Sequence, residues 1–415
     1  MDFPSMVRIR QTFETPAIPD VAERVRAELR RVGLPRKVKP GSRVAIAVGS
    51  RGIACIPAVA ATLVSELKAL GAKPFIVPAM GSHGAATAPG QKEVLEGLGV
   101  TEEAMGAPIQ ATMEVAQIGE LESGMPVYMD RNAHGADAII VANRIKPHSV
   151  SCQRIGSGVM KIIAIGLGKQ KGCSTIHRYT WGFPEGPYDV IEQVARMAIE
   201  RSPLILGIAV LDNAYARPAR IVALEAREIP EIEPRLFREA MSLMASLPTD
   251  ELDVLIVERM GKNISPAGLD PFVIGDRLYG DKKDKPRIKR VAVLDLTEES
   301  HGNAVGVGAA DIISLRLFTK IDRKAMYMNS ISGSRLENSK IPVIQDTDRE
   351  AVEVALKTIG TVEPQDARVI RIRSTLELDE MYVSRSLAEE VARNPRVRVA
   401  GEPQQLSFDE AGNLL

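Results

Sequence analysis

The chain has 415 residues, of which 45% are hydrophobic and 26% are charged, and its 53 basic and 53 acidic residues cancel. A neutral chain has no global field favouring nucleic acid or an anionic membrane, so we expect neither as a partner. No stretch approaches the roughly 18 apolar residues of a membrane span, and the first residues lack the apolar segment of a secretory signal. We therefore expect a cytoplasmic protein.

Apolar runs and helical spacing alternate through the first half of the chain. Residues 56–71 have the periodicity of a helix, with Pro57 near its start and Gly71 just past its end. Short apolar runs that are separated by helices predict a parallel sheet covered on both faces. The predicted strands are 43–50, 73–82, 135–147, 204–213 and 219–226.

The second half repeats this alternation after a change of character at 228–252, where prolines bracket a helical segment. The sequence thus predicts an α/β protein of two domains, 1–247 and 248–415, with mostly parallel sheets and an active-site cleft between the domains. The predicted strands of the second domain are 252–259, 289–297, 340–346 and 367–374.

Cationic and imidazole side chains follow several predicted strands, and acids are few there. Ligands of open parallel sheets bind at the carboxyl ends of the strands, so these positions favour a pocket for a carboxylate or a phosphate. The chain has only five histidines, and three of them lie in the first domain beside Gly- or Pro-rich turns. The residues concerned are Arg51, His83, Arg144, Lys146, His148 and, in the second domain, Lys262.

Cofactor and metal motifs of common types are missing. GSGVMK (156–161) and GLGKQKG (166–172) do not fit the phosphate loop GxxxxGK[ST], and no dinucleotide fingerprint is present. The cysteines Cys55, Cys152 and Cys173 form no CxxC pair, and no H-E-x-x-H occurs. A bound metal would have histidine at most from the protein, and a cofactor would have to supply its other ligands.

Four short motifs in a fixed order resemble the nickel-pincer lactate racemase family of 2-hydroxyacid racemases and epimerases. They are GSHGAAT (81–87), KPH (146–148), GSGVMK (156–161) and IH (176–177). The resemblance spans most of the chain. It implies a first domain that carries the cofactor and the catalytic histidines, and a second domain that closes the cleft.

The resemblance also implies the roles of individual residues and the cofactor, a nickel complex of pyridinium-3,5-bisthiocarboxylic acid mononucleotide. One histidine would remove the hydroxyl proton of a 2-hydroxy acid as hydride leaves its C2, and the other would serve the opposite face. The enzymes that make the cofactor would be partners. The implied roles are acid and base for His83 and His148, covalent attachment for Lys161, nickel ligation for His177, cofactor contact for Ser50 and Gly158, and substrate binding for Arg51 and Lys262.

Lys161 is the expected attachment residue rather than Lys169 or Lys171. It enters an apolar run directly after Gly-Ser-Gly, where desolvation favours the neutral, nucleophilic amine. The other two lie in a polar GKQKG segment, where we expect water to keep them charged.

Departures from the family pattern leave the substrate open, and two other functions compete. Val48 stands where the family usually has an aspartate, and no arginine follows His83, so we do not assume that lactate is the substrate. The first alternative is a zinc-dependent hydrolase or lyase using His83, His148 and His177. The second is a non-catalytic protein that binds a phosphometabolite in its Gly-rich turns.

Overall fold

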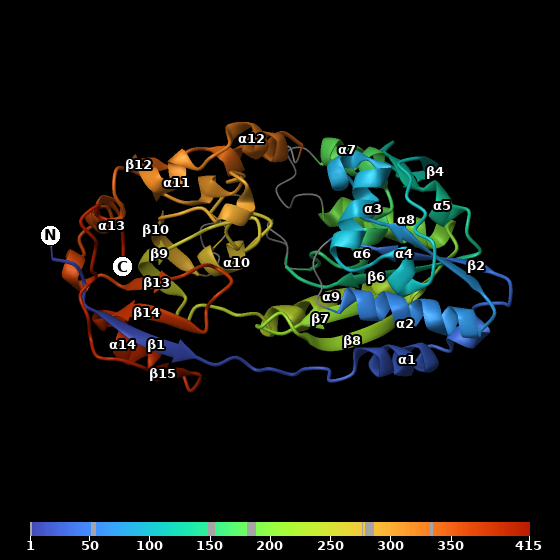
Figure 1. Cartoon of the computed structure of the whole chain (residues 1–415), viewed down its shortest axis with the longest axis horizontal. Helices are drawn as coiled ribbons and strands as arrows, with labels where there is room; N and C mark the ends of the chain where they lie inside the picture. Colours follow the sequence, from blue (N-terminus) through green and yellow to red (C-terminus); the bar gives the residue numbers. More distant parts are fainter. Residues whose placement is uncertain are drawn as a thin grey trace. The chain divides into compact units, whose positions relative to one another are not determined.

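The computed structural model describes residues 2–50, 55–147, 154–180, 188–275, 277–278, 286–332 and 335–415. Within these ranges, no helix is long and apolar enough to cross a membrane. The chain divides into two compact units (Figure 1). The N-terminal unit extends from Glu14 to Met244, and the C-terminal unit combines Met1–Phe13 with Ala245–Leu415.

A five-stranded sheet forms the centre of the N-terminal unit. Its first four strands are parallel, as the sequence predicts, and β8 is antiparallel to β7. Only residues 213–217 separate β7 from β8, whereas a parallel crossover needs about a dozen residues or more, so this pair forms a hairpin. The order is β3 (Lys73–Pro78), β2 (Arg43–Val48), β6 (Ala138–Arg144), β7 (Leu204–Asp212) and β8 (Pro218–Glu225).

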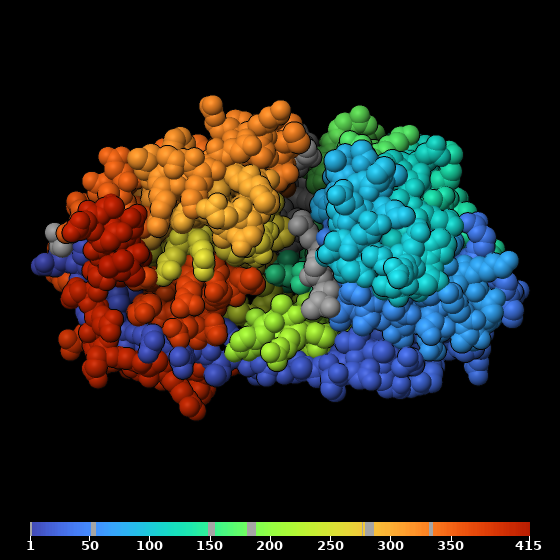
Figure 2. Space-filling model, viewed as in Figure 1, coloured from blue at the N-terminus to red at the C-terminus, as the bar shows by residue number. Residues whose placement is uncertain are grey.

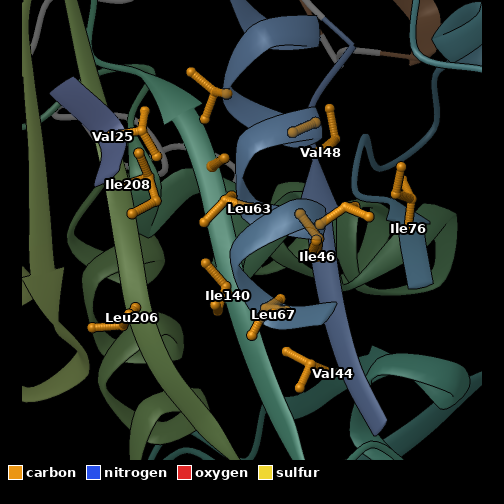
Figure 3. Close-up of a cluster of buried hydrophobic side chains, with 14 of the residues drawn as sticks. Val25, Val44, Ile46, Val48, Leu63, Leu67, Ile76, Ile140, Leu206 and Ile208 are labelled. Atoms are coloured by element: carbon orange, nitrogen blue, oxygen red, sulfur yellow. The ribbon is translucent and has the colours of Figure 1, made fainter. Parts of the chain in front are cut away.

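Helices α1 (Val21–Arg31) and α2 (Ile56–Ala69) cover one face of this sheet. Val44, Ile46 and Val48 alternate along β2, and all three point into the cluster that α1 and α2 close (Figure 3). Val48 is fully buried there. The position where the sequence resemblance leads us to expect an aspartate is therefore part of an apolar core in this chain.

The opposite face is covered by helices from the second half of the unit. A Cβ at Gly207 of β7 would lie 2.7 Å from Val159 and 3.0 Å from Ile229, while its neighbours Leu206 and Ile208 point into the α1–α2 cluster. The elements on this side include α6 (Val159–Lys161), the π-helical turn η3 (Ile162–Gly166), α7 (Lys169–Tyr179), α8 (Tyr188–Arg201) and α9 (Ile229–Ser242).

Short elements complete the N-terminal unit. A 3-10 turn, η2 (Gly84–Ala86), follows β3, and a two-stranded antiparallel sheet packs beside α7 and α8. Other elements of this unit are α3 (Ala88–Gly97), α4 (Glu102–Met105), β4 (Val115–Glu120), β5 (Pro126–Asp130) and α5 (Arg131–His134).

The C-terminal unit is built on an eight-stranded mixed sheet with an apolar cluster on each face. Helix α12 forms part of its surface (Figure 2). It exposes Tyr327, Met328 and Ile331. The strand order is β12 (Val343–Gln345), β11 (Ile312–Ser314), β10 (Arg287–Val293), β9 (Glu251–Val257), β13 (Val369–Ile372), β14 (Glu380–Ser384), β1 (Met6–Gln11) and β15 (Val397–Val399). The helices are α10 (Pro271–Ile274), α11 (Leu315–Thr319), α12 (Arg323–Ser332), α13 (Asp348–Lys357) and α14 (Arg385–Val391).

Strand β1 corrects the predicted extent 1–247 of the first domain. It pairs antiparallel with β14 and with β15, at the other end of the chain. Ile9 is fully buried in one cluster of the C-terminal unit, and Met6 is buried in the other. The chain then enters the N-terminal unit at Glu14 and leaves it after Met244.

Candidate active site

The carboxyl ends of β2 and β3 bring Ser50 and His83 together. The two strands are parallel neighbours, so the residues that follow them emerge at the same edge of the sheet. Ser50 Oγ is hydrogen-bonded to His83 Nδ1. The His83 amide donates to the Met80 carbonyl over 3.1 Å, which holds the histidine at the start of η2.

The turn after His83 is strained and packs tightly on α3. Ala85 and Ala86 have φ values of 53° and 54°, in the left-handed region that a Cβ disfavours. A Cβ at Gly84 would lie 2.5 Å from the Gly90 backbone, so only glycine fits this approach. Backbone strain of this kind persists where the surrounding structure imposes it, and it clusters at functional sites.

Residues 159–179 are mostly helical and carry both Lys161 and His177. The loop before His83 packs directly against this run: the Gly81 amide donates to the Gly166 carbonyl over 3.2 Å. A Cβ at Gly81 would lie 3.6 Å from Cys173 Cβ. His177 lies four residues after Cys173 in α7, one turn along the same face of the helix.

Cys173 links three of these segments. Burial raises the pKa of its thiol, and the hydrogen bond with Ser82 and the charge of Lys161 oppose that shift. The thiol therefore lies near both the residue before His83 and the expected attachment lysine. Lys161 and His177 are both half-buried. His83, Lys161 and His177 are thus on adjoining segments of one unit.

The segment before Lys161 is fixed by buried polar groups. Asn143 Nδ2, at the end of β6, donates to the Gly158 carbonyl over 3.0 Å. Glu233 of α9 is fully buried and accepts a hydrogen bond of 2.9 Å from the Met160 amide at the start of α6. Burial raises the Glu233 pKa to about 8, although the hydrogen bonds from Met160 and Val159 oppose the rise. The helix that carries Lys161 therefore starts on a carboxyl group whose pKa burial raises well above its usual value.

Residues 5–185 match the family model described as the lactate racemase N-terminal domain. This part of the chain is a lactate racemase-like domain. The lactate racemase apoprotein from Thermoanaerobacterium thermosaccharolyticum has a similar structure, with a TM-score of 0.54 at 12% identity. The similarity covers 90% of this chain and 99% of that one, and at this identity it shows a shared fold. A search of curated proteins finds no match.

In the lactate racemase-like domain, Lys169 is not the solvated residue that the sequence predicts. It is fully buried, and its Nζ lies 3.1 Å from Asp130 Oδ2. The prediction failed because the polarity of GKQKG is local, whereas the acceptors come from other segments. Lys171 is exposed, and its Nζ lies 4.4 Å from the centroid of the Tyr128 ring. Because Lys169 is buried in an ion pair, Lys161 stays the predicted residue for attachment of the cofactor.

One cation that the sequence offers for an anionic ligand is paired within the protein. Arg144, at the end of β6, lies 2.9 Å from Asp212 at the end of β7, and both side chains are mostly buried.

Burial and the charge of Asp212 raise the pKa of the nearby Cys55 thiol to about 12, so this cysteine is protonated and is not a nucleophile.

The structure describes two of the four remaining predicted site residues. Arg51 and His148 lie outside the described residues, so their roles remain predictions. Lys146 holds the segment before α6 through its backbone, which exchanges two hydrogen bonds of 2.8 Å with Ser157. Lys262 belongs to the C-terminal unit, where its Nζ donates to the Pro266 carbonyl over 2.6 Å.

Sequence reasoning missed three buried polar residues that support this edge of the sheet. They are Gln91, Asp130 and Glu233, and each is fully buried. A polar residue within an apolar helical face is a signal for burial, and Glu233 and Gln91 both fit that pattern. The sequence does not reveal their partners, which come from distant segments.

Proposed function

We propose that this protein is a racemase or epimerase of a 2-hydroxy acid that works with a lysine-tethered nickel-pincer nucleotide. The supporting observation is the packing of the His83 loop against residues 159–179 around Cys173. The segments that carry a candidate acid–base group, a candidate attachment residue and a candidate metal ligand adjoin in this packing. The segment that matches the lactate racemase N-terminal domain contains all three.

The donor set of the N-terminal unit fits a metal that brings most of its own ligands. Within the described ranges, no group of three or more His, Cys, Asp or Glu side chains could hold a metal ion. His177 offers one imidazole from the last turn of α7, and the sulfur donors that nickel accepts would come from the cofactor. Lys161 is partly exposed, as a residue that is acylated must be.

The bound cofactor would supply an acceptor for the hydrogen on C2 of the substrate, which leaves as hydride. His83 would take the hydroxyl proton at Nε2, because Ser50 binds Nδ1 and fixes the ring. The planar 2-oxo acid would then regain hydrogen on its other face, and His148 would return the proton there. Arg51 and Lys262 would hold the carboxylate.

The test is racemisation by protein that is co-expressed with the cofactor-making enzymes. Intact mass should show one adduct, and metal analysis should show nickel. A panel of 2-hydroxy acids, deuterated at C2, would be separated by chiral chromatography. Hydride transfer retains deuterium at C2, whereas proton abstraction exchanges it with solvent. Loaded protein that racemises none of these acids, or that loses the deuterium, would contradict the proposal.

The same metal analysis separates the competing function. A hydrolase or lyase that uses the three histidines would hold zinc and no covalent adduct. Nickel together with an adduct on the protein would support the racemase.

A further inference from the structure

A buried ammonium group connects four segments of the N-terminal unit. Lys169 Nζ forms an ion pair of 3.1 Å with Asp130, donates to Gln91 Oε1 over 2.8 Å, and donates to the Pro78 carbonyl. Two hydrogen bonds and one ion pair therefore hold this ammonium group. Burial lowers the Lys169 pKa and raises the Asp130 pKa, while the attraction between the two charges opposes both shifts.

Gln91 extends this network to the loop that carries His83. Its side chain is fully buried in α3. Its Nε2 donates to the Gly81 carbonyl over 2.8 Å and to the His83 carbonyl over 3.3 Å. The amide oxygen of Gln91 is bound to Lys169, so the orientation of the amide is fixed and its N–H groups must point at the loop.

The Lys169–Asp130 pair lies where two helices begin, α7 at Lys169 and α5 after Asp130. Lys169 has a φ of 55° that a lysine adopts only under constraint. Asp130 caps α5 by accepting from the Ala133 amide over 2.9 Å, and its own amide donates to the Leu167 carbonyl over 2.6 Å. The strained start of the helix that carries His177 is thus tied to the His83 loop.

We infer that Gln91 is a positioning residue for His83 and that Lys169 fixes the orientation of the Gln91 amide. The inference rests on the proposed acid–base role of His83. The network costs two buried charges, and an apolar pair could fill the same volume at lower cost. Its distinguishing property is geometric: it fixes the backbone on both sides of Ser82, which sets the His83 ring against Ser50.

The test uses Gln91→Met, which keeps the volume and the Lys169–Asp130 pair but removes the donors to the loop. Long-range 1H–15N NMR spectra of the cofactor-free protein resolve the five histidine rings, and His83→Gln assigns the signal of interest. We expect the His83 ring nitrogens to move to the values of a mobile, tautomer-averaged imidazole. The signals of His134 and His301 should not move. The matched control is Lys171→Met, which removes an exposed lysine from the same turn and should leave every ring unchanged.

In the loaded enzyme, Gln91→Met should lower kcat by about a hundredfold with little change in KM, the effect expected of a misplaced catalytic group. Gln91→Glu should behave similarly, because a carboxylate accepts from Lys169 but cannot donate to the carbonyls. Unchanged His83 signals in a folded variant would overturn the inference. Failure of both variants to fold would also overturn it, because the network would then be a requirement of the fold. The NMR result is independent of any racemase activity, so the two proposals can fail separately.

Discussion

A Cβ at Gly158 would lie 1.9 Å from Glu233 Oε1. The carboxyl group of a buried acid on α9 therefore occupies the space that any side chain at this position would need. Gly156 is similar, since its Cβ would lie 2.6 Å from both the Lys146 carbonyl and the Phe237 ring. The glycines before Lys161 are required by packing against α9 and the backbone, whether or not a cofactor approaches them.

Replacement Gly158→Ala should destabilise the N-terminal unit by about 1 to 3 kcal/mol, because the new methyl group must displace a packed carboxyl group. Gly97→Ala is the control: Gly97 is the last residue of α3, and its Cβ would have no atom within 4 Å. It should be neutral or slightly stabilising. Denaturant titration measures both, and equal effects for the two variants would contradict the packing argument.

Glu233→Gln should change how stability depends on pH. The folded pKa of about 8 lies above the usual 4.5, so the folded state holds a proton that the unfolded state releases. This contribution to stability is complete below the unfolded pKa and is lost as the pH rises towards 8. The Gln variant has no such titrating group. As the pH rises across this window, the free energy of unfolding of the variant minus that of the wild type should therefore increase by about 1.4 kcal/mol per pH unit.

The measurement for Glu233 is urea unfolding of both proteins at several pH values between 4.5 and 8. Only the difference between the two proteins matters, because other groups titrate equally in both. Parallel stability curves would show that Glu233 is not protonated in the folded state. Glu390→Gln, at a more exposed carboxyl group in the C-terminal unit, is the control. Arg368 lowers the folded pKa of Glu390 below its usual 4.5, so the contribution of this group to stability is complete above that pH. The stability difference between Glu390→Gln and the wild type should therefore stay nearly constant across the window.

Lys161→Ala should abolish the covalent adduct in protein loaded with the cofactor. Lys171→Ala should retain it, because that exposed lysine stacks on Tyr128. Peptide mapping of the wild type should place the added mass on the peptide that contains Lys161. An adduct that survives in Lys161→Ala would disprove the assignment.

His177→Ala should lose nickel while keeping the organic adduct, because the residue would bind the metal and not the nucleotide. Metal analysis and intact mass report the two losses separately. His301→Ala, at an exposed histidine of the C-terminal unit, is the control and should retain both. Full nickel content in His177→Ala would mean that another residue binds the metal.

The sequence predicts the strands of the N-terminal sheet well because each is a short apolar run bounded by Gly or Pro. The sequence does not predict that β8 is antiparallel to β7, because apolar periodicity contains no information on strand direction. Strand β1 was missed because its partners are far away: Arg10 pairs with Glu380, which lies 370 residues later. Local patterns carry no information on such pairings.

The candidate site also has features that the sequence predicts and features that it does not. The edge of the sheet where Ser50 and His83 meet follows from the order of parallel strands, and a rule on strand ends suffices to predict it. The burial of Lys169 does not follow, because its three polar partners come from residues 78, 91 and 130. The role of Gly158 does not follow either, since its neighbour Glu233 lies on a helix from a later part of the chain.

The pairing of β1 with β14 and β15 also imposes an order on biosynthesis. Strand β1 leaves the ribosome long before its partners, because Arg10 precedes Glu380 by 370 residues. At about 5 to 20 residues per second, β1 waits on the order of 20 to 70 seconds for them. During that time the N-terminal unit can fold while β1 remains an unpaired strand, and unpaired strands are the segments most prone to aggregate. Arg8 and Arg10 in β1 carry charges that discourage such contacts before Glu380 arrives to pair with them.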